Sequence, residues 1–138
     1  MVCSIGDETV GRRMGNTIQQ DRALFALEHV QRVISKPLEE QKEFKNVAAE
    51  LPAMIHMNGL GQAVAFYCSK RESDKGRRWL YECLDEWLRR DGQIYSGGSE
   101  LLSSITTGNQ RSYRLAQVEA LSVALWVKKF ATAFLDSD

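Results

Sequence analysis

Leu51–Lys70, which reads LPAMIHMNGLGQAVAFYCSK, is the stretch that decides how this chain folds. Nineteen consecutive residues, 51–69, carry no Asp, Glu, Lys or Arg, although 26% of the whole chain is charged. Its proline, histidine, amides and glycines make it too polar for a membrane span. We therefore expect a buried element, with His56 in or near the core. A sharp bend is expected at Asn58-Gly59, because both residue types tolerate left-handed backbone angles.

The rest of the composition predicts one compact helical domain. A chain of 138 residues is long enough for a single core. Proline occurs at two positions, and the apolar–polar alternation of strands is nearly absent. We expect an all-α, single-domain bundle of five or six helices over residues 16–138, preceded by a mobile arm at residues 1–15.

Charge and cysteine content restrict the class of protein. Eighteen basic residues balance eighteen acidic ones, which argues against broad, charge-driven nucleic-acid binding but allows a local basic face. The three cysteines, Cys3, Cys68 and Cys83, are an odd number at wide spacing, and no signal peptide is recognised. We expect reduced thiols and a cytoplasmic protein.

Local signals place the helix boundaries. Thr17 and Gln20 fit a capping box that begins the first helix, on which Arg22 and His29 are expected to face solvent. Pro37 suits the first turn of a second helix, and Pro52 is expected to end that helix near Glu50. The further helices are expected at residues 53–57, 60–69, 74–90, 100–106 and 112–135.

The most basic window joins the helices expected at residues 60–69 and 74–90. It contains Lys70, Arg71, Lys75, Arg77 and Arg78 at a loop that enters a helix. Helix N-termini attract anions, so this window is a candidate phosphate contact. An exposed polar loop without a ligand is an equally open interpretation. In the helix that follows, Arg78–Glu82, Asp85–Arg89 and Glu86–Arg90 are spaced to form ion pairs.

The last helix is the second candidate site. Its core face is expected to contain Leu115, Ala120, Val123, Trp126, Val127, Phe130 and Phe134. Arg111, Arg114, Lys128 and Lys129 fall within roughly one-third of the helical circle, with Val118, Leu121 and Leu125 between them.

This arrangement leaves two questions open. The apolar group either contacts another protein or is covered by residues 100–106 or by the N-terminal arm. Tyr113, between Arg111 and Arg114, either stacks on a base beside a gripped phosphate or anchors the start of the helix.

The sequence contains no catalytic or metal-binding constellation. It has two histidines, no CxxC or HExxH motif and no nucleophile elbow. We expect no enzymatic activity, no cofactor, no metal, no small-molecule substrate and no membrane partner.

Two motifs resemble those of the small helical subunit of the type III-B (Cmr) CRISPR effector complex. The first is a Leu-Pro…Asn-Gly-Leu-Gln…Ala-Phe pattern, and the second is a Tyr-Arg…Glu-Ala…Trp…Lys…Ala pattern. They are matched by Leu51, Pro52, Asn58, Gly59, Leu60, Gln62, Ala65 and Phe66, and by Tyr113, Arg114, Glu119, Ala120, Trp126, Lys128, Lys129 and Ala131. Together with Gln20-Asp21-Arg22-Ala23, the resemblance covers residues 17–135.

The resemblance implies a non-catalytic subunit of an RNA-guided antiviral defence complex. Its expected partners are other Cmr subunits, further copies of itself, guide RNA and target RNA. It would stack with copies and line the groove that holds the guide–target duplex. Two other functions remain open from the residues alone. One is a helical protein–protein adaptor without nucleic-acid contact, and the other is a small enzyme built around His29 or His56.

Overall fold

The computed structural model describes residues 17–136 and shows six helices without a strand in that range. The helices are α1 (Ile18–Gln31), α2 (Leu38–Asn58), α3 (Leu60–Lys70), α4 (Lys75–Arg89), α5 (Leu101–Thr107) and α6 (Gln110–Phe134). The predicted all-α single-domain bundle is confirmed. The mobile arm expected at residues 1–15 lies outside the described residues.

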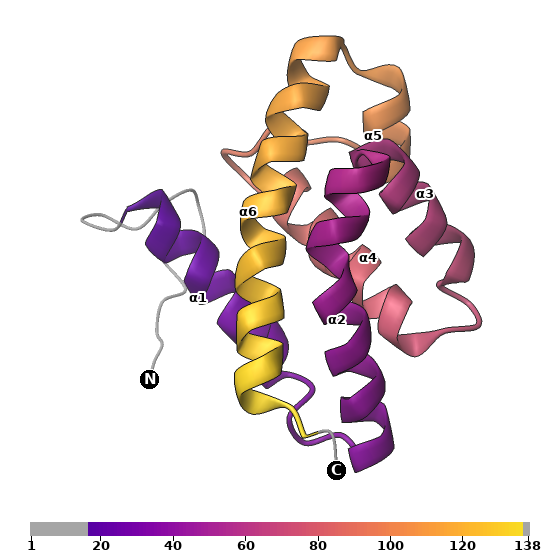
Figure 1. Ribbon diagram of the computed structural model, residues 1–138. Coiled ribbons are helices and arrows are strands. Elements are labelled where there is room, and N and C mark those ends of the chain that lie inside the picture. The colour runs from indigo at the N-terminus through magenta and orange to yellow at the C-terminus, as the bar shows by residue number, and fades with distance from the viewer. Residues whose placement is uncertain (1–16, 137–138) are drawn as a thin grey trace.

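The two longest helices, α2 and α6, run side by side in opposite directions at the centre of the bundle (Figure 1). Helix α1 crosses α6 on one side, and α3 and α4 cover α2 on the other. The short α5 lies near the junction of α2 and α3 and contacts α3 and α4. This arrangement leaves one long face of α6 open to solvent.

The predicted bend between α2 and α3 is confirmed at Gly59. This residue has φ +84° and ψ 156°, a conformation that is accessible essentially to glycine alone. The N–H of Leu60 then donates to the side-chain oxygen of Gln117 at 2.9 Å. The bend is therefore fixed by its own backbone and by a contact from α6.

The expected helix end at Pro52 is wrong, because α2 continues through it to Asn58. The residues expected as a separate helix at 53–57 are its last turns. A proline inside a helix costs roughly 3 kcal/mol through the lost N–H and a steric clash. Here Phe44, Leu51 and Ile55 are buried on the same helix, so tertiary packing on both sides of α2 outweighs that cost.

The predictions for the two histidines are also wrong: His29, expected at the surface, is buried, and His56, expected in or near the core, is exposed. His29 is 2% exposed, because aromatic residues of α4 pack against α1 at this position. Its ring stacks on Trp79 at 5.8 Å and on Phe25 at 5.4 Å between ring centroids. His56 is exposed instead, as is Met57, which is 78% exposed. An absence of charge therefore did not mean burial throughout the opening stretch.

The core face of α6 consists of smaller residues than expected. Leu115 and Phe134 are each 50% exposed, whereas Ala116, Ala120, Ala124 and Ala131 are fully buried. Alanines let the backbones of α1 and α2 approach α6 closely, so the larger side chains lie at the edges of the contact. Trp126 and Phe130 are partly buried there and stack at 5.5 Å.

Candidate nucleic-acid interface

The basic window between α3 and α4 is largely neutralised within the fold. Lys75 pairs with Glu40 at 3.5 Å, Arg78 pairs with Glu82 at 3.2 Å, and Arg77 pairs with Asp74 and Glu50. Arg71 lies 3.9 Å from Glu72 and donates to the backbone oxygen of Cys68. Lys70 lies over the Phe66 ring at 5.9 Å. Each predicted contact residue of this window therefore has an intramolecular partner.

Carboxylates already occupy the N-terminus of α4, where an anion was expected to bind. Asp74 caps the helix by accepting the N–H of Arg77 at 3.0 Å, and Glu43 of α2 accepts the N–H of Gly76 at 3.4 Å. A hydrogen bond with Asp74, followed by burial, raises the pKa of Glu43. Burial opposes ionisation of Asp74, but its bonds to Arg77 and Glu43 lower its pKa overall. These two groups supply the negative charge that a phosphate would bring.

Helix α6 presents a different electrostatic surface. Its four basic side chains, Arg111, Arg114, Lys128 and Lys129, are all exposed, and none forms an ion pair or hydrogen bond with another residue of the 17–136 region. The one acidic residue of α6, Glu119, is buried and binds Arg22. The open face of α6 therefore carries an uncompensated positive charge.

The apolar group between these cations is accessible from solvent. Val118 is 65% exposed and Leu125 is 46% exposed, while Leu121 is partly buried against the core. Helix α5 does not cover Val118 or Leu125, because it lies at the α3 and α4 side of the bundle. Of the three candidate interface residues, two thus stand free on the same face as the cations.

Tyr113 connects α6 to α3. Its hydroxyl accepts the backbone N–H of Gly61 at 2.9 Å, in the first turn of α3, and its ring lies against that glycine. Helix α6 begins next to it with Asn109, whose side chain accepts the N–H of Ser112 at 2.8 Å. Of the two interpretations of Tyr113, this geometry favours an anchor at the start of α6.

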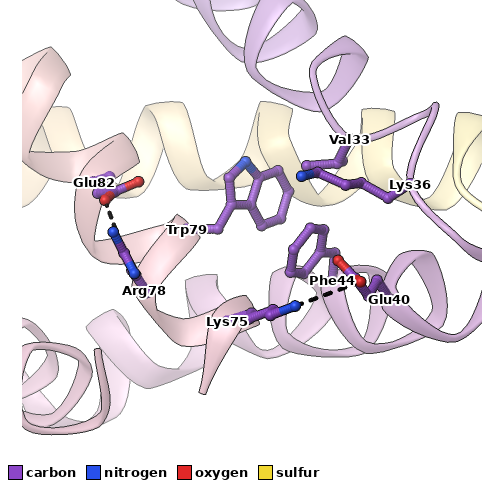
Figure 2. A pocket seen from close by; sticks show the side chains of 8 residues that line it. All are labelled: Val33, Lys36, Glu40, Phe44, Lys75, Arg78, Trp79 and Glu82. Carbon is purple, nitrogen blue, oxygen red and sulfur yellow. Dashed lines mark hydrogen bonds and ion pairs between the residues drawn. The ribbon is translucent and has the colours of Figure 1, made fainter. Parts of the chain in front are cut away.

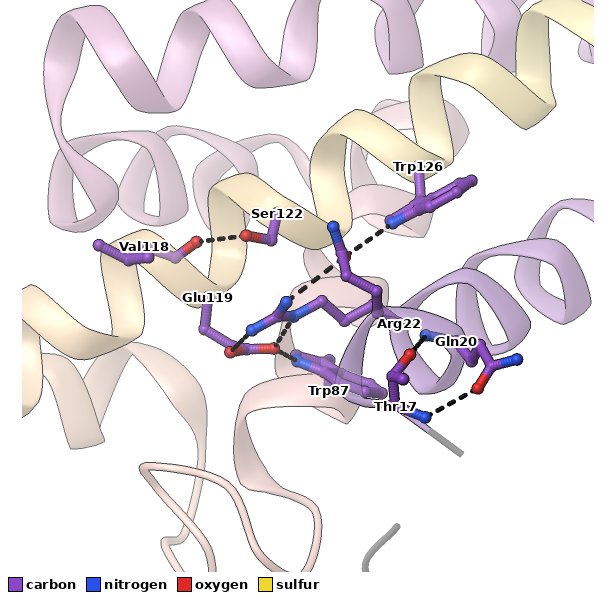
Figure 3. A network of polar contacts seen from close by, with 9 residues as sticks. Thr17, Gln20, Arg22, Trp87, Val118, Glu119, Ser122 and Trp126 are labelled. Atoms are coloured by element: carbon purple, nitrogen blue, oxygen red, sulfur yellow. Dashed lines mark hydrogen bonds and ion pairs between the residues drawn. The ribbon is translucent and has the colours of Figure 1, made fainter. Parts of the chain in front are cut away.

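A polar network fixes α6 against α1 and α4 (Figure 3). Arg22 donates from Nε and Nη2 to the two carboxylate oxygens of Glu119, each at 2.7 Å, and the Trp87 indole donates to Glu119 at 2.8 Å. Burial opposes ionisation of Glu119, but the bonds from Arg22 and Trp87 lower its pKa overall. On the outside of α1, Gln19 accepts from the Trp126 indole at 3.2 Å.

Sequence reasoning missed this network and assigned Arg22 to the solvent side of α1. One signal was present, since Glu119 is the single acidic residue among the 25 of α6. A lone carboxylate on an otherwise apolar and basic helix indicates a specific partner. The identity of that partner depended on which helices meet.

The two histidines of the enzyme alternative lie in unlike surroundings. His29 is buried among aromatic rings, and His56 is exposed on α2. Residues 17–136 contain no group of three or more His, Cys, Asp or Glu side chains arranged to hold a metal ion. Within the same range, no helix combines the length and apolarity needed to cross a lipid bilayer.

Comparison with known proteins decides the family. The model of a family described as CRISPR-associated protein (Cas_Cmr5) matches residues 18–134. The chain belongs to the Cmr5 family. This confirms the resemblance drawn from the two sequence motifs and makes the chain a small subunit of the type III-B (Cmr) CRISPR system.

A solved structure of a Cmr5 family protein supports the same assignment. The crystal structure of a CRISPR-associated Cmr5 family protein from Thermus thermophilus matches with a TM-score of 0.69 and 28% sequence identity. The match covers 88% of this chain and 100% of the other. The helical architecture described above is thus shared with a Cmr5 protein along its full length.

Proposed function

We propose that this Cmr5 protein is a non-catalytic subunit that uses the open face of α6 to line the RNA groove of its effector complex. In this role it works in a prokaryotic cytoplasm beside other Cmr subunits, guide RNA and target RNA. The observation that carries the proposal is the contrast between two basic regions. The cations of the α3–α4 window have intramolecular partners, whereas Arg111, Arg114, Lys128 and Lys129 have none within residues 17–136.

The position of Arg111 and Arg114 adds a physical argument. Both lie in the first turns of α6, where the helix dipole already places partial positive charge. Cations there disfavour the helix slightly, so they do not serve its stability. Together with the dipole they attract phosphate, and exposed arginines can do so without reading sequence.

The apolar face between the two cation pairs supports a second part of the proposed role, which is contact between copies of the chain. Lys128 lies 14 residues beyond Arg114, which corresponds to roughly 21 Å along the helix axis. Val118 and Leu125 occupy the space between and are exposed. We propose that this segment contacts a second copy of the chain in the assembled stack, with the cation pairs at either side facing RNA.

Charge reversal tests the RNA contact. Four variants with Arg111→Glu, Arg114→Glu, Lys128→Glu or Lys129→Glu, and their combination, are placed in a complex reconstituted with guide RNA. Target-RNA capture should fall with each reversal and fall most with all four. A matched control with Lys70→Glu and Arg71→Glu makes the same charge change as Arg111→Glu with Arg114→Glu, at the α3–α4 window.

The outcomes separate the candidate functions. Equal losses from the control and from the α6 pair would transfer the contact to the α3–α4 window or to net charge alone. Unchanged capture with all four α6 reversals would favour the protein–protein adaptor, which the exposed Val118 and Leu125 also support. Cleavage of labelled RNA by the isolated chain with divalent metal would contradict the non-catalytic role.

A further inference from the structure

The sequence carries sixteen residues before Thr17, which lie outside the part that the Cmr5 family model matches, residues 18–134. They read MVCSIGDETVGRRMGN. Their two acidic residues, Asp7 and Glu8, are adjacent, and apolar residues occur on both sides of this pair. A segment of this chemistry complements a surface that is both cationic and apolar.

The first turn of α1 lies beside the edge of α6 that borders its open face (Figure 3). Gln19 accepts the Trp126 indole at 3.2 Å, and Arg22 binds Glu119 at 2.7 Å. The segment before α1 ends at Thr17, two residues before Gln19. It therefore joins the described part of the chain next to the open face of α6.

The open face of α6 is apolar first and cationic second when it is followed from Trp126 toward the start of the helix. The exposed residues between Trp126 and Arg114 are Leu125, Val118 and Leu115. Arg114 and Arg111 follow, and neither has a partner within residues 17–136. An acidic group that approaches along this face therefore meets unpaired arginines beyond an apolar stretch.

The acidic pair of residues 1–16 has the length of chain needed to reach those arginines. Followed backwards from Thr17, the apolar Val10 comes before the pair. Glutamate and aspartate lie nine and ten residues before Thr17, which allows a reach of roughly 30 Å in an extended chain. Arg114 lies twelve residues before Trp126, or roughly 18 Å along the helix axis. The contact therefore needs no fully extended chain.

The basic pair Arg12-Arg13 does not oppose this path. It lies between Val10 and Thr17 in the sequence. On the path described, it runs alongside the apolar part of α6 and not against Arg111 or Arg114.

The shallow hollow on the α2–α4 side is a poorer match for an acidic segment (Figure 2). Its volume is about 290 Å³, and its two cations on α4 already pair with Glu40 and Glu82. The hollow is also bordered by Lys36, which lies beyond the far end of α1 from Thr17. The open face of α6 is both nearer in sequence and less neutralised.

We propose that residues 1–16 fold back over the first half of the open face of α6, with Asp7 and Glu8 on Arg111 and Arg114. Surface ion pairs are individually weak, but a tethered segment has a high effective concentration at its own chain. RNA or a second copy of the chain then binds this half of the face only after residues 1–16 leave it. This competition rests on the role proposed for α6, whereas the contact within the chain does not.

Photocrosslinking of the isolated full-length chain tests the contact. Val118, which is 65% exposed, is replaced by p-benzoylphenylalanine, and light and heavy-isotope-labelled chains are mixed before irradiation. We expect mass spectrometry to find a link to residues 1–16 within one chain. A link between light and heavy chains, or no link, would overturn the proposal. The same probe at Leu38 of α2, which is 46% exposed, is the control, and an equal yield there would also overturn it.

Charge reversal tests whether the acidic pair holds the segment. Asp7→Lys with Glu8→Lys should lower the crosslink yield from position 118 about fivefold or more, because attraction to the α6 cations becomes repulsion. Glu28→Lys with Glu39→Lys is the matched control, which makes the same charge change at exposed residues of α1 and α2. Equal yields from the two double variants would overturn the assignment of Asp7 and Glu8.

The RNA affinity of the same two double variants measures the competition. The Asp7→Lys, Glu8→Lys variant should bind double-stranded RNA about threefold or more tightly than the Glu28→Lys, Glu39→Lys control, because its face is open more often. Fluorescence anisotropy at one low salt concentration gives both values, and equal affinities would overturn the competition. If neither variant binds RNA, the role proposed for α6 fails, whereas the crosslink still decides the contact within the chain.

Discussion

Arg22 and Glu119, separated by 97 residues in the sequence, form a two-pronged ion pair between α1 and α6 with both N–O distances at 2.7 Å. Their side chains are 16% and 11% exposed, so the pair is shielded from most solvent. Trp87 of α4 shares the same carboxylate. One acidic side chain thus connects three helices and fixes the rotation of α6, which decides which of its faces remains open.

Removing Arg22 should destabilise the protein far more than removing a surface arginine. Arg22→Ala leaves a mostly buried carboxylate with one donor, Trp87, and should lower the free energy of unfolding by about 3 kcal/mol. Arg78→Ala is the control, because Arg78 and Glu82 are 60% and 58% exposed, and its loss should cost about 0.5 kcal/mol or less. Urea unfolding monitored by circular dichroism measures both. Similar losses for the two variants would contradict this role of Arg22.

Stability should depend on pH through His29. Burial, followed by the nearby Arg32 charge, lowers the pKa of His29 to about 4, against the weaker opposing effects of the Trp79 backbone and Glu82. Because its pKa in the folded state lies below the unfolded value of about 6.5, the unfolded chain binds more protons between these values. The buried, neutral His29 therefore contributes to the free energy of unfolding in full above pH 6.5. This contribution is lost as the pH falls toward 4, and the loss is roughly 3 kcal/mol at most.

The His29→Gln variant isolates this effect. Glutamine does not titrate, so the decline in unfolding free energy between pH 6.5 and 4 should be shallower in the variant than in the wild type. Glu86 lies 3.5 Å from the ring and favours the charged form. A wild-type curve parallel to that of the variant would show that Glu86 compensates the burial.

Sequence reasoning succeeded where the signal was local. The Thr17–Gln20 capping box, the bend at Gly59 and the ion pairs Arg78–Glu82 and Asp85–Arg89 are all present. Each depends on residues at most four apart, whose geometry follows from the helix itself. The last pair of that series, Glu86–Arg90, was wrong because Arg90 lies over the Trp87 ring at 4.8 Å instead.

The features that could not be predicted depend on contacts between helices. Which side of α1 is buried depends on both α6 and α4, so a one-sided helical wheel placed His29 and Arg22 on the solvent side. The candidate site shows the same limit. Sequence identified all the cations of both basic regions, but only the fold shows which of them are paired, because Glu40, Glu43 and Glu50 reach the α3–α4 window from α2.

Gly59 should tolerate no side chain. Its φ of +84° with ψ 156° is unfavourable for other residues, and a Cβ would approach the Tyr113 hydroxyl at 3.1 Å. Gly59→Ala should therefore lower the free energy of unfolding by about 2 kcal/mol. Gly61→Ala is the control, because its Cβ would make an ordinary 3.5 Å contact and alanine favours the helix. A neutral Gly59→Ala would show that the α2–α3 bend adapts.

Tyr113 should matter to stability and not directly to RNA. Tyr113→Phe removes the acceptor of the Gly61 N–H and should cost about 1 kcal/mol of unfolding free energy. Tyr113→Leu also removes the ring, and stacking on a base would then appear as a loss of roughly 1 to 3 kcal/mol in RNA affinity. We expect no such loss in filter-binding assays at temperatures where both variants are folded. A loss with Tyr113→Leu that Tyr113→Phe does not show would assign stacking to the ring.

The salt dependence of RNA binding should report how many α6 cations reach phosphates. Each phosphate contact with single-stranded RNA contributes roughly 0.7 to the slope of log affinity against log salt, and with a duplex roughly 0.9. Alanine at both Arg111 and Arg114 should thus reduce the slope by between one and two of these increments, and alanine at Lys128 and Lys129 by a similar amount. Because the two pairs lie roughly 21 Å apart along α6, their effects should add. A slope that changes with one pair alone would place the RNA path across one end of α6 and leave the other end for a protein partner.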